Sequence, residues 1–189
     1  MQAPSGGLPS HRHPCVAFKL MQEVQCRRPL FNRTSGAALP LTGAVGAGAL
    51  LSCRRPIYSR FFRGKTAYAM GKVGMSVLTK GLAMDWQREG KHDMAITSIW
   101  PTSAIESAAT LAASNDPEQR QDLRHPAIFS DAIRAMLAAP PATVNGLLDT
   151  DEDFLRNYAG VTDFSRYSLV PGTNPRRIMP AGFPLARGC

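Results

Sequence analysis

The feature that most constrains the fold is an alternation of apolar runs with stretches of helical periodicity. Apolar runs of the kind found in strands covered on both faces occupy residues 44–52, 94–100 and 144–148. Apolar residues recur at helical spacing over residues 66–88, where Thr66 can cap the start, and over residues 128–138, which end before two prolines. Strand, helix, strand, helix, strand is the order that builds a parallel sheet. We therefore predict an α/β fold with a doubly wound parallel sheet over residues 44–189.

Residues 1–43 differ from this body in composition. Five prolines interrupt both helical and strand periodicity, which predicts an irregular head, with disorder as an alternative. Ten Lys and Arg residues but only one acidic residue lie up to Lys65, whereas twelve bases and thirteen acids follow. The formal charge of +8 therefore comes from the first 65 residues, the head and the segment that follows it. Because the head lacks interleaved aromatic residues, we predict no nucleic-acid partner.

Three further classes of protein are disfavoured. Residues 34–53 carry no charge and are long enough to cross a bilayer, but Pro40 and four glycines dilute them, so we predict no membrane span. The four cysteines form no CxxC pair and have no histidines at ligand spacing, which predicts no metal site and a reduced intracellular protein. No secretory signal is visible. A cytoplasmic location is the default, with mitochondrial or peroxisomal locations as alternatives.

Asp149, Asp151 and Asp153 imitate the start of a calcium-binding loop. The sixth position of that loop needs glycine and is Phe154, and the twelfth needs glutamate and is Gly160. We therefore expect a solvated acidic edge here.

The pair that carries chemistry is Tyr68 and Lys72. Four residues apart on a helix, the two side chains share one face. A free tyrosine has a pKa of about 10, and an ammonium group a few ångströms away favours the phenolate. Such a pair can exchange a proton in carbonyl reduction or alcohol oxidation. With four tyrosines and five lysines in the chain, the pair alone is weak evidence, so its surroundings decide.

The surroundings resemble a known family. Residues 66–84 read TAYAMGKVGMSVLTKGLAM, and residues 96–107 read ITSIWPTSAIES. Together they resemble the C-terminal half of the short-chain dehydrogenase/reductase family, closest to its hydroxysteroid dehydrogenase-like branch. The resemblance covers about residues 44–175 and implies an incomplete Rossmann-like sheet.

The resemblance implies roles for three residues. Tyr68 would deliver or take the proton, and Lys72 would lower the pKa of the tyrosine and hydrogen-bond the ribose of the nicotinamide half. The serine that polarises the substrate carbonyl in the family ends the preceding strand. Ser52 stands there, sixteen residues before Tyr68. Ser59 is nearer to Tyr68 but falls in a loop that varies in the family, where a solvated hydroxyl is the simpler interpretation.

The resemblance also implies cofactor contacts after the next strand. The family has Pro-Gly there, followed by an Ile or Val whose backbone meets the nicotinamide carboxamide. In this sequence Pro101-Thr102 replaces Pro-Gly, and Ile105 and Ser107 fall where the Ile and a Thr would be. Pro101, Ile105 and Ser107 would thus join Tyr68 and Lys72 in binding NAD or NADP. Packing in the core is the alternative for Ile105.

The dinucleotide-binding part of the family has no clear counterpart. A full fold needs four strands with their helices, about 120 residues, before the catalytic strand, whereas 67 residues precede Tyr68. The glycine-rich residues 42–48 are one residue short of the TGxxxGxG spacing of the family. We therefore expect only the C-terminal half of the fold, and the choice between NAD and NADP stays open.

Two functions follow from these expectations. The first is an NAD(P)-dependent oxidoreductase that acts on a small-molecule carbonyl or alcohol substrate. The second is a non-catalytic fragment that acts through dimerisation, with the helix of residues 66–88 as the dimer contact. Gly71, Gly74 and Gly81 within that helix each cost about 1 kcal/mol relative to alanine unless another backbone or a ligand comes close.

Overall fold

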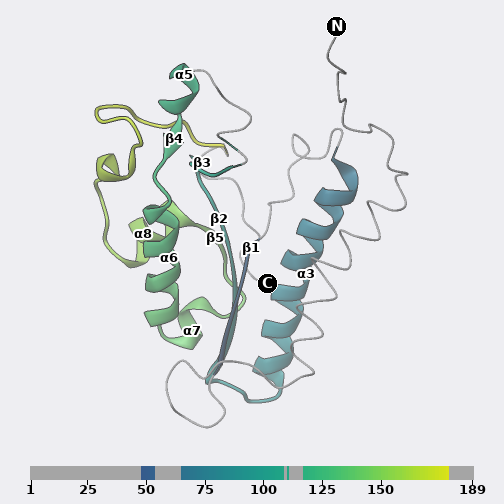
Figure 1. Ribbon diagram of the computed structural model, residues 1–189. Helices are drawn as coiled ribbons and strands as arrows, with labels where there is room; N and C mark the ends of the chain where they lie inside the picture. The colour runs from purple at the N-terminus through teal and green to yellow at the C-terminus, as the bar shows by residue number, and fades with distance from the viewer. Residues whose placement is uncertain (1–47, 54–64, 109, 111–116, 179–189) are drawn as a thin grey trace, which may run out of the picture.

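The fold is that of a computed structural model, which describes residues 48–53, 65–108, 110 and 117–178 (Figure 1). The head at residues 1–43, the glycine-rich string up to residue 47, and Ser59 lie outside the described residues.

A parallel sheet of three strands forms the centre of the described structure. The strands are β1 (Gly48–Cys53), β2 (Met94–Trp100) and β5 (Leu148–Thr150), in the order β1-β2-β5. Both neighbouring pairs are parallel, with Ser52 opposite Ser98 and Trp100 opposite Thr150. The predicted parallel α/β arrangement is confirmed, with three strands among the described residues.

Helices cover both faces of this sheet (Figure 1). Helix α3 (Thr66–Arg88) lies against one face, whereas α6 (Ala127–Ala138), α7 (Pro141–Val144) and α8 (Asp151–Tyr158) lie on the other. Six of the seven residues of β2 are buried because this central strand is covered on both sides. In the described part of the chain, no helix is long and apolar enough to cross a membrane.

A second, small sheet follows β2. Strand β3 (Ala104–Ile105) pairs in parallel with β4 (Leu123–Arg124), and the short helix α5 (Pro117–Arg120) precedes β4. The 3-10 helix η3 (Ser165–Tyr167) packs beside them through the bond that His125 N donates to Tyr167 O, 2.7 Å. The sequence patterns did not predict this sheet because two-residue strands have no periodicity.

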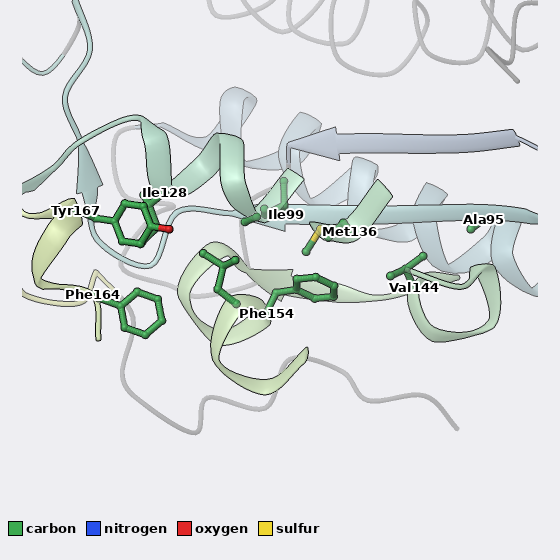
Figure 2. Close-up of a cluster of buried hydrophobic side chains, with 10 residues drawn as sticks. Ala95, Ile99, Ile128, Met136, Val144, Phe154, Phe164 and Tyr167 are labelled. Carbon is green, nitrogen blue, oxygen red and sulfur yellow. The ribbon is translucent and has the colours of Figure 1, made fainter. Parts of the chain in front are cut away.

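The hydrophobic core lies mainly between the sheet and α6 and α8. Ile99, Ile128, Met136 and Phe154 meet there, and each is at most 2% exposed (Figure 2). Full burial of one such side chain contributes about 2 to 3 kcal/mol. A smaller cluster on the other face joins Leu82, Ala83 and Trp86 of α3 to Ile96 of β2.

Helix α3 differs from its expected packing in two ways. Lys65, with no side-chain cap, precedes the helix, so Thr66 is its first residue and not its cap. Three apolar residues that contributed to the helical pattern, Met70, Val77 and Met84, are 51%, 65% and 62% exposed. The face turned to the sheet instead carries small and hydroxyl residues alongside Met75, Leu82 and Trp86.

The strand expected at residues 144–148 is wrong in its position. Val144 ends α7, and β5 begins only at Leu148, because a turn anchored between α3 and β2 intervenes. Asn145 Oδ1 accepts a bond from Ile96 N at 3.2 Å, and Gly146 N donates to Ile96 O at 2.7 Å. Gly146 has φ +73°, and a Cβ there would lie 2.9 Å from Ala83 Cβ. Only glycine fits this approach of the turn to α3.

Candidate active site

Tyr68 and Lys72 occupy the first two turns of α3. Both side chains are half-buried, and Lys72 Nζ lies 5.8 Å from the centroid of the Tyr68 ring. The helix starts after β1 and runs back along the sheet, so its first turns stand at the edge where the parallel strands end (Figure 1). In open α/β sheets, ligands bind at this carboxyl edge. A phenol and an ammonium group there can hold hydroxyl groups and exchange a proton.

Ser52 lies one residue before the end of β1, at the same edge. It is paired in register with Ser98 of β2. For Ser52 the structure describes the backbone, so its catalytic role stays a prediction. Its place at the carboxyl end of the strand before α3 is the one that the family resemblance requires.

Two buried hydroxyl groups fix α3 against the sheet. Thr79 and Ser98 are both fully buried, and their oxygens lie 2.6 Å apart. Thr79 Oγ1 also donates to Met75 O at 2.8 Å, within the helix. The pair lies two turns below Lys72 and determines how α3 lies against β2. Sequence analysis missed it, although a threonine and a serine within apolar patterns could have signalled a buried hydrogen bond.

Thr102, which stands where the family has glycine, is built into the framework. It is fully buried, and its N–H donates to Asp151 Oδ1 at 2.8 Å. Its hydroxyl donates to Thr150 Oγ1 at 2.7 Å, and its carbonyl accepts from Ile178 N at 2.7 Å. The loop that Pro101 begins is therefore held by the junction of β5 and α8.

Ile105 and Ser107 follow in the same loop. Ile105 lies in β3, half-buried, and packs against the main core cluster, as the packing alternative predicted; its backbone contact to a cofactor stays a prediction. Ser107 is exposed, and its hydroxyl accepts from Thr110 N at 3.2 Å. Thr110 in turn donates from Oγ1 to Ile105 O at 3.0 Å. The described contacts of Ser107 are thus those of a local capping group.

The acidic residues 149–153 do not form a solvated edge; that expectation is wrong. Asp149, Asp151 and Glu152 are 7%, 1% and 6% exposed. Burial raises the pKa of Asp151 to about 6, although bonds from the N–H groups of Thr102 and Glu152 oppose the shift. Glu152 forms an ion pair with Arg124 at 2.9 Å. The sequence could not show this because Arg124 lies 28 residues away on another element.

Metal ligands do not gather in the part of the chain that the structure describes, which contains no group of three His, Cys, Asp or Glu residues able to hold an ion.

The sequence is similar to curated proteins of one name, although it matches no protein-family model. Hydroxysteroid dehydrogenase-like protein 2 of Danio rerio is 32% identical over 112 residues, which cover 59% of this chain and 25% of that protein. The Mus musculus protein of the same name is 27% identical over 161 residues, covering 84% of this chain and 31% of that protein. The chain thus spans between 25% and 36% of the length of the curated relatives it matches.

Solved structures show the same similarity in three dimensions. A short chain dehydrogenase from Mycobacterium thermoresistibile is 25% identical, with a TM-score of 0.69, over 93% of this chain and 60% of that chain. A short chain dehydrogenase from Shigella flexneri, complexed with NADP, shares the fold at 19% identity and a TM-score of 0.55, over 76% and 56% of the two chains.

These similarities and the sheet order define the class: the chain resembles the C-terminal half of a short-chain dehydrogenase/reductase. Within that class it is similar to the hydroxysteroid dehydrogenase-like proteins, as the residues around Tyr68 predicted.

Proposed function

We propose that this chain is the catalytic part of an NAD(P)-dependent oxidoreductase that interconverts a small carbonyl compound and its alcohol. The observation that carries the proposal is the half-buried pair of Tyr68 and Lys72 at the carboxyl edge of the sheet, with 5.8 Å between the ammonium nitrogen and the ring centroid. The NADP in the Shigella flexneri structure of the same fold supports the cofactor class.

Each residue of the site has one task in this proposal. Tyr68 Oη gives its proton to the substrate oxygen in reduction and takes it back in oxidation. Lys72 holds positive charge beside the phenol and binds the ribose hydroxyls. Ser52 donates a hydrogen bond to the substrate carbonyl and orients it.

The nicotinamide, when bound, supplies or accepts the hydride. The donor set at the start of α3 fits its ribose, since a phenol and an ammonium group both bind hydroxyls. Pro101, Ile105 and Ser107 would line the nicotinamide side, where the loop is fixed through Thr102. Tyr68 and Ser52 would both contact the substrate oxygen.

Tyr68→Phe tests the assignment because it removes one hydroxyl and leaves the ring in place. Loss of the acid/base group should lower kcat by about a hundredfold or more, without change in the thermal melting temperature. Tyr158→Phe, at a half-exposed tyrosine of α8 away from the site, is the matched control and should keep full turnover. Aldehydes and ketones with NADH or NADPH provide the assay. Turnover retained by Tyr68→Phe would refute the assignment.

A second role, pairing with another copy through α3, is favoured by its exposed apolar stripe. Met70, Val77 and Met84 recur every seven residues, which places them on one side of the helix. On the same side, a Cβ at Gly81 would meet nothing within 4 Å among the described residues. A glycine that leaves this surface flat suits the close approach of a second helix. If the chain is an active enzyme, pairing would be a second property beside catalysis. If the chain is inactive, pairing would be its only function.

A further inference from the structure

A cleft of about 580 Å³ is lined by residues of α8, η3 and residues 173–177. These elements lie on the far side of the sheet from α3 (Figure 1). Four arginines line the cleft, Arg124, Arg156, Arg176 and Arg177, with two carboxylates, Glu152 and Asp163. Neither Tyr68 nor Lys72 is among its lining residues. The volume lies in the range typical of sites for small molecules.

Glu152 is shared by three of these arginines. Its carboxylate lies 2.9 Å from Arg124, 3.0 Å from Arg156 and 3.6 Å from Arg177. Arg177 has a second partner, Asp153, at 2.7 Å. Two carboxylates thus face three guanidinium groups, while Asp163 of the lining and Asp122, 2.7 Å from Arg176, balance the remaining charge. An anion would therefore be held by individual guanidinium donors and not by a net positive charge.

Arg124 also has an unused hydrogen-bond donor. Its side chain is 4% exposed, and it donates from Nη1 to Phe164 O at 3.0 Å and from Nη2 to Glu152. Its Nε is buried and has no hydrogen-bond partner among the residues that the structure describes. A buried N–H without an acceptor costs about 1 to 3 kcal/mol, so an acceptor supplied by a ligand would be stabilising.

Two contacts fix the guanidinium group of Arg156 at the same cleft. Its guanidinium group lies 4.8 Å above the centroid of the Phe164 ring, while its Nη2 donates to Glu152. Stacking on an aromatic ring fixes the plane of the guanidinium group and leaves donors at its edge. The side chain is 46% exposed, so those donors can be reached from the cleft.

We propose that this cleft binds the oxyanion group, phosphate or carboxylate, of a small organic ligand. Guanidinium groups bind both groups through paired, charge-assisted hydrogen bonds. Arg124 and Arg156 supply the inner contacts, and Arg176, whose side chain is 84% exposed, reaches from the rim. The site is separate from the Tyr68–Lys72 pair and does not depend on its catalytic role.

Calorimetric titration of the full chain with inorganic phosphate, sodium acetate and sodium chloride at equal ionic strength tests the proposal. We expect saturable binding of phosphate, acetate or both at one site per chain, and none of chloride. The anion that saturates identifies the ligand as a phosphate or a carboxylate compound. Saturation by neither oxyanion would overturn the proposal.

Variants then locate the site. Arg156→Gln should weaken binding about tenfold, the loss expected for one charge-assisted hydrogen bond. Arg176→Gln, at the exposed rim, should weaken it less and serves if Arg156→Gln does not fold. Arg134→Gln, an equal change of charge at an exposed position of α6 outside the cleft, should leave binding within about twofold of the wild type. Binding that survives both cleft variants unchanged would come from elsewhere, such as the basic head, and would contradict the proposal.

Discussion

The start of α3 and the start of α8 both carry charged side chains near the carboxyl edge of one sheet, yet they differ in burial. At α8, Asp151 and Glu152 are nearly inaccessible and are bound to Thr102 and Arg124 of distant segments. At α3, Tyr68 and Lys72 are half-buried and reachable. The difference indicates that the acidic residues at the start of α8 hold the loops in place, whereas the pair on α3 has the accessibility that its proposed catalytic role requires.

Removing the charge at the centre of the α8 network should have the largest effect on stability. Glu152→Gln leaves three guanidinium groups without their shared carboxylate and should lower the free energy of unfolding by about 3 to 5 kcal/mol. Urea denaturation measures it. Glu89→Gln, which breaks the exposed pair with Lys91, is the control and should cost less than about 1 kcal/mol. If both variants lowered the free energy of unfolding by the same amount, the ion pairs of α8 would be no more stabilising than a pair on the surface.

The pH dependence of Asp151 gives the next largest effect. Burial raises its folded-state pKa from 3.8 to about 6, so between these values the folded chain binds more protons than the unfolded chain. The contribution of Asp151 to stability is therefore present at low pH and is lost as pH rises towards about 6.

Asp151→Asn cannot titrate and should abolish this dependence. Relative to the variant, the wild type should lose stability from pH 4 to 6.5, by at most about 3 kcal/mol, since one pKa unit corresponds to about 1.4 kcal/mol. Denaturant curves at several pH values give the slope. Parallel curves for the two proteins would show that the carboxyl group is not buried in this way.

Substitutions in the exposed stripe of α3 should have the smallest effect on the free energy of unfolding. Val77 is 65% exposed, so Val77→Asp should change the stability of the single chain by less than about 0.5 kcal/mol. If α3 pairs two copies, the same change should convert a dimer to a monomer in sedimentation equilibrium. Gln121→Asp, at an exposed position between α5 and β4 and away from the stripe, should leave the dimer intact. A wild-type monomer at every concentration would rule out pairing through α3.

Local patterns predicted α3 and β2 with the bounds observed, because a long helix and a central buried strand depend on periodicity within each segment. Local patterns gave wrong predictions where contacts between segments far apart in the sequence determine the structure. The turn at residues 145–147 delays the start of β5, and it is held by the bonds of Asn145 and Gly146 to Ile96 of β2. The acidic residues 149–153 resembled a surface, although their partners, Thr102 and Arg124, lie on other elements.

The candidate site could be predicted in part. Tyr68 and Lys72 are neighbours on one helix, so their spacing sufficed. The expectation for Ile105 named both a cofactor contact and core packing, and the structure shows the packing. Met70, Val77 and Met84 fitted the helical pattern equally well as core residues, because periodicity identifies a face but not what covers it.

The most direct test of the central claim is fluorescence titration of the full chain with NADH and NADPH. A chain that uses Tyr68 and Lys72 in hydride-transfer chemistry should bind at least one of the two saturably. Lys72→Met should weaken that binding about tenfold, whereas Lys91→Met, at an exposed lysine beyond α3, should not. The absence of saturable binding by the wild type, or binding that does not depend on Lys72, would contradict the account.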